Sequence, residues 1–196
     1  GMIIDIAHAS DETFYDVLKC SKSPIVSTHS CCRTLASHRR NMSDEMLRAL
    51  ADNGGVIQIN FYPVFLSDAF AKTLSDSGLE SKSWTEQDWI SDPLNPAKAA
   101  AWNAVQDELA ALPRPSYKDV VDHIDHAVKV AGIDSVGIGS DFDGIEVTPV
   151  GLENVSKIRV IFDEMSRRGY TEDQIEKVAG RNFLRVFEKV TELAVK

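Results

Sequence analysis

The chain has 196 residues, of which 43% are hydrophobic and 26% are charged, and its formal net charge at pH 7 is −9. This composition is typical of a globular protein with a sizeable core. The negative charge argues against nucleic acid and anionic membrane as partners, because both would repel it. No apolar run approaches the roughly 18 residues that a membrane span needs, and residues 2–6 are too short and lack the basic flank of a signal peptide.

Four stretches are predicted to be buried strands, because each is short, β-branched and followed by polar residues. They cover residues 2–7, 25–28, 55–61 and 135–139. A helical pattern follows each strand. Strands that alternate with helices indicate a parallel sheet with the helices packed outside it. The sequence therefore predicts an α/β fold.

The helices are bounded by recognisable capping residues. Ser10 and Ser43 are the expected N-caps of the first two helices, and Ser10 is followed by the acidic residues Asp11 and Glu12 in the first turn. A third helix is expected to end at Gly132, and Thr171 with Gln174 predicts a capping box near the end of the chain.

Residues 67–116 interrupt the regular alternation after the third predicted strand. Within them, Asn95 and Pro96 predict the start of an Ala-rich helix that runs to about Leu112. A long excursion at the carboxyl end of a strand is more often functional than idle. We therefore expect residues 1–196 to form a single domain in which residues 67–116 are an insertion or a lid.

The number of strand–helix units is too small for a complete barrel. A (β/α)₈ barrel takes about 250 residues and eight units, whereas this chain supplies about four parallel strands with outer helices. The prediction is therefore half of a TIM-type (β/α)₈ barrel. Open sheet edges and an uncovered apolar face then lead us to expect a homo-oligomer or a partner half.

Ligand-type residues stand at three of the four predicted strand ends, which is where barrels of this kind carry their active sites. They are His8, His29 and Asp141. A single histidine at such a place is more often structural, but three such residues at one end favour a metal site. Imidazole and carboxylate groups suit Zn²⁺. A bound metal lowers the pKa of water and polarises a carbonyl, which are the requirements of amide hydrolysis.

Several motifs in order along the chain resemble the zinc-dependent membrane (renal) dipeptidase family, in its carboxyl-terminal half. They are His8 with His29 21 residues later, Thr28-His29-Ser30 followed by Arg39-Arg40-Asn41, Asn60-Phe61-Tyr62, Asp122-His123-Ile124-Asp125-His126, Gly139-Ser140-Asp141-Phe142-Asp143-Gly144, and Asn182-Phe183-Leu184-Arg185-Val186-Phe187. The resemblance covers nearly the whole chain except the excursion. Each motif alone is weak, and their combination is specific.

This resemblance implies a metallo-dipeptidase and assigns roles to four residues. His8 and His29 are implied to bind one of the family's two zinc ions, and Arg40 to hold the free carboxylate of a dipeptide substrate. Asp141 is implied to contact the substrate and to handle the proton of the attacking water. The family's His-x-Asp pair and bridging glutamate are absent from this sequence. We therefore expect an incomplete fragment that lacks the first metal site, binds at most one Zn²⁺ and is inactive in isolation.

Each role competes with a simpler interpretation. Arg40 lies in a basic cluster with Arg33, His38 and Arg39, which alone suggests a solvated face paired with local acids. A guanidinium that clamps a carboxylate is the interpretation that the resemblance favours. The alternatives at the level of function are another metal-dependent amidohydrolase or lactonase of the same fold, and a non-catalytic half-barrel fragment.

Other reactive residues are expected to be structural. His123 and His126 lie in the middle of a predicted helix, away from any strand end. Cys31 and Cys32 are expected to fill a tight turn, because thiolates would compete with a site built from nitrogen and oxygen. Asp5 is expected to point to the face opposite His8. Together with Cys20, the cysteines form no disulfide framework. This favours the cytoplasm, and a periplasmic or secreted location stays open if a signal lies upstream.

Overall fold

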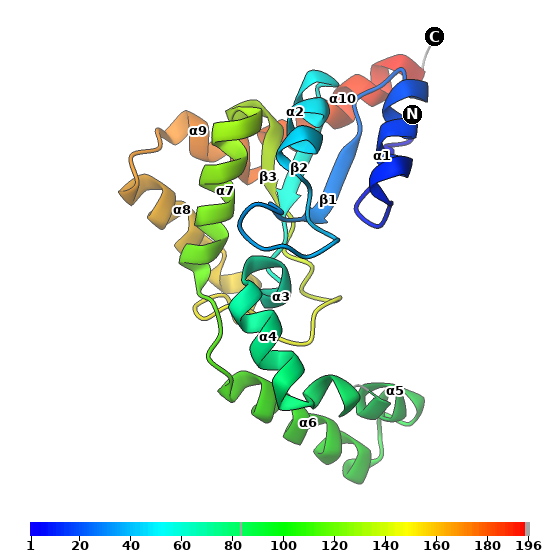
Figure 1. Ribbon diagram of the computed structural model, residues 1–196, viewed down its shortest axis with the longest axis vertical. Helices are drawn as coiled ribbons and strands as arrows, with labels where there is room; N and C mark the ends of the chain where they lie inside the picture. The colour runs from blue at the N-terminus through cyan, green and yellow to red at the C-terminus, as the bar shows by residue number, and fades with distance from the viewer. Residues whose placement is uncertain (83, 195–196) are drawn as a thin grey trace.

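The computed structural model describes residues 1–82 and 84–194, and its centre is a small parallel sheet (Figure 1). The strands are β1 (Val26–Ser30), β2 (Val56–Ile59) and β3 (Val136–Ile138), hydrogen-bonded in the order β1-β2-β3. Both pairs are parallel, with Val26 opposite Val56 and Ile57 opposite Val136. The predicted parallel sheet is confirmed, and with it the α/β class.

The prediction of a strand at residues 2–7, the first of the four in chain order, is wrong. Only Asp5 pairs there, in a single parallel bridge with Val26, and the chain then turns so that Ala9 N donates to Ile6 O. The Asp5 carboxylate accepts a hydrogen bond from Ala7 N at 3.0 Å. A side chain that bonds to its own backbone in this way competes with the strand ladder, so the segment reaches the sheet edge and leaves it at once.

The helices and short helical turns follow the strands in the predicted alternation. They are α1 (Asp11–Cys20), α2 (Asp44–Asp52), α3 (Pro63–Leu66), α4 (Asp68–Ser77), η1 (Leu79–Lys82), α5 (Trp84–Ser91), α6 (Pro96–Ala111), α7 (Tyr117–Ala131), η2 (Ile133–Ser135), η3 (Val155–Lys157), α8 (Arg159–Arg167), α9 (Glu172–Glu176), the π-helical turn η4 (Lys177–Arg181) and α10 (Asn182–Ala194). In the part of the chain that the model describes, no helix is long and apolar enough to cross a membrane.

The predicted capping residues are confirmed. The Ser10 and Ser43 hydroxyls accept hydrogen bonds from the backbone N–H groups of Thr13 and Met46. Thr171 and Gln174 form the expected capping box. These side chains satisfy N–H groups that a helix start leaves without a partner.

The main core lies on the α2 and α7 side of the sheet. Ile57 and Ile59 point there and are fully buried with Leu47, Leu50 and Ile124. On the other side, a smaller cluster joins β1 and β2 to α10. It consists of Val26, Val56, Val186 and Val190. The sheet is thus covered on both faces at its amino-terminal end, and its polar strand ends lie toward the opposite end.

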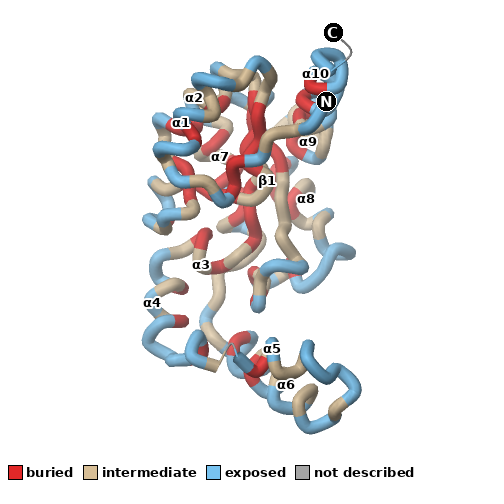
Figure 2. The backbone as a smooth tube through the Cα atoms, turned by 90° about the vertical axis from the view of Figure 1, so that its right-hand side faces the viewer, coloured by how far each residue is buried: buried red, intermediate tan, exposed pale blue. Residues whose placement is uncertain are grey.

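The excursion forms a helical arm that extends away from the sheet (Figure 1). Asn95 caps α6 and Pro96 opens it, as predicted, and the helix ends at Ala111. The arm has its own small apolar cluster, which includes Phe70 and Leu109. Figure 2 shows buried backbone concentrated around the sheet and mostly exposed backbone along α5 and α6. The role of the arm as a lid stays a prediction.

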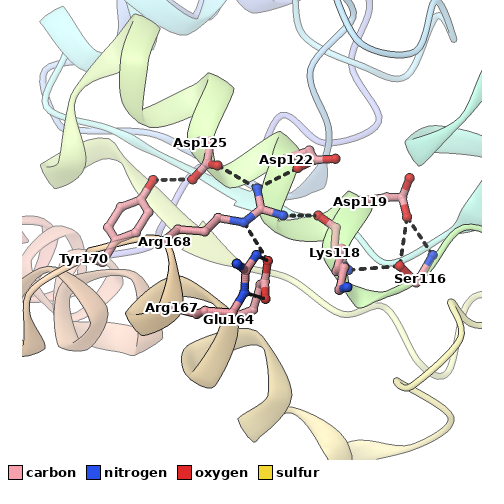
Figure 3. Close-up of polar contacts among 9 residues, drawn as sticks. All are labelled: Ser116, Lys118, Asp119, Asp122, Asp125, Glu164, Arg167, Arg168 and Tyr170. Atoms are coloured by element: carbon pink, nitrogen blue, oxygen red, sulfur yellow. Dashed lines mark hydrogen bonds and ion pairs between the residues drawn. The ribbon is translucent and has the colours of Figure 1, made fainter.

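Arg168 holds α8 against α7 through ion pairs with three acidic side chains, a group that we call the arginine hub (Figure 3). The Arg168 guanidinium donates to Asp122 at 2.6 Å, to Asp125 at 2.7 Å and to Glu164 at 2.8 Å. The Glu164 side chain is only 3% exposed. Hydrogen bonds from Arg167 and then Arg168 lower the pKa of Glu164 to about 2. The hub therefore neutralises a nearly buried carboxylate and fixes the chain that follows β3.

Candidate metal and substrate site

Two histidines from different segments meet at the end of the sheet. His8 lies in the turn after the Asp5 bridge, and His29 lies near the end of β1. Their Nε2 atoms are 2.8 Å apart and their ring centroids 4.9 Å apart. Partial loss of solvation beside the neighbouring groups, followed by the positive charge of Arg40, lowers the pKa of His8, although its side chain remains largely exposed. A neutral imidazole is the form that can bind a metal ion.

The pair has the donor chemistry and nearly the spacing of two ligands to one metal ion. Tetrahedral zinc with Zn–N bonds of about 2.0–2.1 Å holds two nitrogens about 3.3 Å apart, so the rings need to separate by roughly half an ångström. His8 is exposed and His29 is half-buried, which leaves room for this shift. Within residues 1–82 and 84–194, no group of three or more His, Cys, Asp and Glu side chains is placed to hold a metal ion. The pair could therefore supply two ligands, where catalytic zinc typically takes three from the protein.

Arg40 approaches the histidines with part of its guanidinium unused. Its Nε donates to Ala7 O at 2.9 Å, and its guanidinium carbon lies 5.5 Å from the centre of the Phe65 ring. Its Nη2 is buried, and no hydrogen-bond partner for it is found among the described residues. Burial lowers the pKa of Arg40, and the negative charge of Asp141 opposes this effect. A buried, unused N–H donor on a cation is suited to a carboxylate.

The interpretation of the basic cluster as a paired surface applies to Arg33 instead. Its guanidinium donates to both carboxylate oxygens of Asp11, at 2.7 and 2.8 Å. Arg40, by contrast, makes no ion pair with an acid in the described chain, while Arg39 is exposed. His8 and Arg40 line one cavity of about 520 Å³ together with Arg33 and Arg39. Arg33 and Arg40 thus make different contacts within one loop.

A buried asparagine closes that loop and places Arg40. Asn41 donates to Ala36 O and Phe65 O, both at 2.8 Å, and accepts from Cys31 N at 3.2 Å. Its side chain thereby satisfies three backbone groups that have no strand or helix partner. The residue next to Arg40 is therefore rigidly anchored between the end of β1 and α3.

Asp141 follows β3 in a left-handed conformation, with a φ of 62°. Its Oδ2 accepts a hydrogen bond from Asn60 Nδ2 at 3.0 Å, and Asn60 is fully buried just beyond β2. The negative charge of Asp141 raises the pKa values of both His8 and Arg40 against stronger opposing effects. Asp141 lines a second, larger cavity of about 860 Å³ that also borders α6. The charge of the Asp141 carboxylate therefore acts on His8 and Arg40, although Asp141 lines the larger, neighbouring cavity.

Gly144 is where the Asp141 carboxylate needs space. A Cβ atom added to Gly144 would lie 2.4 Å from Asp141 Oδ1. We expect Gly144→Ala to rotate the carboxylate away from Asn60 and, if Asp141 has the catalytic role that the resemblance implies, to reduce kcat of the complete, active enzyme by about 10²-fold, the cost of a displacement of about 1 Å at a reacting group. Kinetics with the unfolding temperature as a control test this. Because Gly169 has no atom within 4 Å of an added Cβ but a φ of 94°, Gly169→Ala should affect stability and leave kcat unchanged.

The other reactive residues are held in structural contacts. Burial lowers the pKa of His123 to about 4, and its ring bonds to Cys32 N at 3.0 Å and Leu66 O at 3.2 Å. His126 Nε2 lies 2.7 Å from Asp44 Oδ1. Burial raises the pKa of Cys32 to about 12, which keeps its thiol protonated at neutral pH. These contacts agree with the structural interpretation of both histidines and of the cysteine pair.

The expected orientation of Asp5 is wrong. Its Oδ2 accepts from the Thr28 hydroxyl at 2.6 Å, and that hydroxyl lies 2.8 Å from His29 Nδ1. The alternation of side chains holds only within a strand, and the strand pairing ends at Asp5. Sequence reasoning named Asp5, Thr28 and Asn60 but gave none of them a role in the candidate site. Two signals in the sequence were available. Asp5 lies three residues before His8, and the hydroxyl residue Thr28 lies next to His29.

Comparisons with known proteins identify relatives of this chain among dipeptidases. A relative from Schizosaccharomyces pombe, named as an uncharacterized dipeptidase, is 38% identical over 98% of this chain and 36% of its own length. The structure of the probable dipeptidase PvdM from Pseudomonas aeruginosa matches 97% of this chain and 51% of that chain, with 31% identity and a TM-score of 0.75.

A metallopeptidase from Rhodobacter sphaeroides, liganded with a phosphinate mimic of the dipeptide L-Ala-D-Ala, shares the fold. It is 24% identical, with a TM-score of 0.69 over 94% of this chain and 41% of that chain. The chain thus spans about half or less of the length of these relatives. A model of the membrane dipeptidase family, peptidase family M19, matches residues 1–196. The chain belongs to the membrane dipeptidase family.

Proposed function

We propose that this chain supplies one part of the active site of a zinc-dependent dipeptidase whose substrates carry a free carboxylate. The observation that carries the proposal is the approach of His8 Nε2 to His29 Nε2, at 2.8 Å, with His8 lining the cavity that Arg40 also lines. Membership of the dipeptidase family supports the reaction class. Two relatives are named as dipeptidases and a third is liganded with a dipeptide mimic, which supports the substrate class.

The proposed roles follow from the contacts of each side chain. His8 and His29 would hold the metal ion, which when bound acts as a Lewis acid and lowers the pKa of water. Arg40 Nη2, which has no protein partner among the described residues, binds the substrate carboxylate and orients the scissile amide. This clamp selects free dipeptides over capped ones.

Asp141 is the proposed acid and base. Asn60 occupies its Oδ2, so Oδ1 accepts the proton that water loses as its oxygen adds to the amide carbon. The same proton then passes from Oδ1 to the amide nitrogen as the C–N bond breaks. The products are two amino acids, and Asp141 returns to its ionised form.

We also propose that the barrel and the metal site are completed by residues that this sequence does not supply. The three-stranded sheet and the two imidazoles support this, as does the span of about half of the solved relatives. The missing ligands would come from an amino-terminal half or from a second copy of this chain. We call the resulting species the assembled enzyme, and we expect the 196-residue chain alone to bind at most one Zn²⁺.

The proposal is tested by an assay of the assembled enzyme with a free dipeptide and with a lactone. We expect the dipeptide to be hydrolysed, chelation to abolish turnover and added Zn²⁺ to restore it. Turnover of the lactone but not of the dipeptide would favour the alternative hydrolase class. Turnover that survives complete metal removal would overturn the metal-dependent mechanism.

A further inference from the structure

A chain of hydrogen bonds reaches from a carboxylate to the back of His29. Asp5 Oδ2 lies 2.6 Å from Thr28 Oγ1, and Thr28 Oγ1 lies 2.8 Å from His29 Nδ1. The other imidazole nitrogen of His29, Nε2, lies 2.8 Å from His8 Nε2. This chain of hydrogen bonds, which we call the relay, thus ends on His29 Nδ1. The other nitrogen, Nε2, faces the candidate metal position.

The number of protons in the relay fixes its direction. An ionised carboxylate can only accept hydrogen bonds, and a threonine hydroxyl has a single proton to donate. The short contact with Asp5 uses that proton, so Thr28 Oγ1 can only accept from His29. His29 Nδ1 must therefore carry a hydrogen, and a neutral His29 ring then has a lone pair on Nε2.

The contact between the two rings follows from the same count. Two bare nitrogens would repel each other at 2.8 Å, so one of the two Nε2 atoms carries a hydrogen. With His29 Nε2 bare, the donor in the metal-free chain is His8 Nε2. The two rings are thus in opposite tautomers.

We propose that Asp5 and Thr28 are positioning residues that hold His29 in the Nδ1–H tautomer and aim its Nε2 lone pair at the metal position. This inference rests on the proposed function only for the identity of the ligand, and the tautomer itself is measurable without metal. The partner of a metal-binding histidine commonly fixes its tautomer and ring orientation.

Asp5 also organises the turn that bears His8. Its Oδ1 accepts from the backbone N–H groups of Ala7 at 3.0 Å and Thr28 at 3.1 Å. One carboxylate therefore fixes the backbone before His8 with one oxygen and the ring of His29 with the other. Because replacement of Asp5 would also disturb the backbone, Thr28 is the cleaner site for a test.

The experiment compares Thr28→Val, which keeps the branched shape and removes the hydroxyl, with Thr28→Ser, which keeps the hydroxyl. Thr34→Val is the matched control, because Thr34 also donates to a carboxylate, that of Asp44 at 2.9 Å, outside the histidine pair. Long-range ¹H–¹⁵N correlation spectra of the metal-free chain at about pH 8, where ordinary histidines are neutral, report the tautomer of each ring.

We expect His29 to be the Nδ1–H tautomer in the chain itself, in Thr28→Ser and in Thr34→Val. In Thr28→Val the Nε2–H tautomer, which free histidine prefers, should become the major form. Zn²⁺ affinity measured by competition with a chelating dye should fall about 10–100-fold in Thr28→Val, the usual cost of losing such a partner, and change less than threefold in Thr28→Ser.

An Nε2–H tautomer of His29 in the unaltered chain would overturn the inference, as would an unchanged tautomer in Thr28→Val. If the tautomers behave as expected but the unaltered chain binds no Zn²⁺, the relay stands and the proposed metal function fails. The two failures are therefore distinguishable.

Discussion

Replacement of Arg40 by alanine should reduce kcat/KM of the assembled enzyme for free dipeptides by about 30- to 1000-fold. The change corresponds to about 2–4 kcal/mol, the range for loss of a desolvated charged partner. The physical reason is that Arg40 Nη2 is buried without a protein partner among the described residues, while Nε is already bonded to Ala7 O. The measurement is steady-state kinetics with a free dipeptide and with its carboxyl-terminal amide.

The amide provides the internal control for Arg40→Ala. Its kcat/KM should be low in the unaltered enzyme and should change little in the variant, because it has no carboxylate to lose. Arg39→Ala is the matched variant, since Arg39 is the exposed neighbour in the same loop. Equal losses with the two substrates, or an equal effect of Arg39→Ala, would reject the carboxylate clamp.

Asp141→Asn should reduce kcat by about 10²–10⁴-fold, the usual contribution of a positioned acid or base. Asparagine retains an oxygen that can accept the hydrogen bond from Asn60 Nδ2, now 3.0 Å from Asp141 Oδ2, so the side chain keeps its place. It cannot, however, carry the proton from water to the leaving nitrogen. Kinetics over a range of pH, with KM reported separately, measure the effect.

Asp143→Asn is the control for Asp141→Asn. Asp143 is exposed, lies two residues along the same turn and lines the same large cavity. It should retain kcat within about threefold. If both variants lose similar activity, the general negative charge of the turn is responsible, and Asp141 is not the specific proton carrier.

Much of the fold was readable from local sequence signals. The caps at Ser10, Ser43 and Asn95 were predictable because each places a short polar side chain before a helical pattern. The strand prediction for residues 2–7 failed although these residues have the composition of a strand. Whether they pair depends on which segments lie beside them in the fold, and the sequence does not show this. Its only bridge, at Asp5, is ended by the carboxylate of the same residue.

The candidate site was predictable in its main side chains and not in their connections. His29 stands near the end of β1 and Asp141 follows β3, and the topology of a parallel sheet brings such ends together. His8 was expected at a strand end as well, but it lies in the turn after the single bridge at Asp5. The contact from Asn60 to Asp141 spans 81 residues, and the one from Thr28 to Asp5 spans 23. Hydrogen bonds of this kind depend on strand register and on where each strand stops. Sequence periodicity determines neither.

The most direct test of the central claim is to measure zinc binding by the 196-residue chain with titration calorimetry. We expect at most one ion per chain, with an affinity that falls at least tenfold in His8→Ala and in His29→Ala, because each supplies one of the two imidazoles at the site. His126→Ala, which removes a histidine bonded to Asp44 outside the pair, should bind zinc as the unaltered chain does. Two stoichiometric ions, or equal affinity in all three variants, would contradict a metal site between His8 and His29.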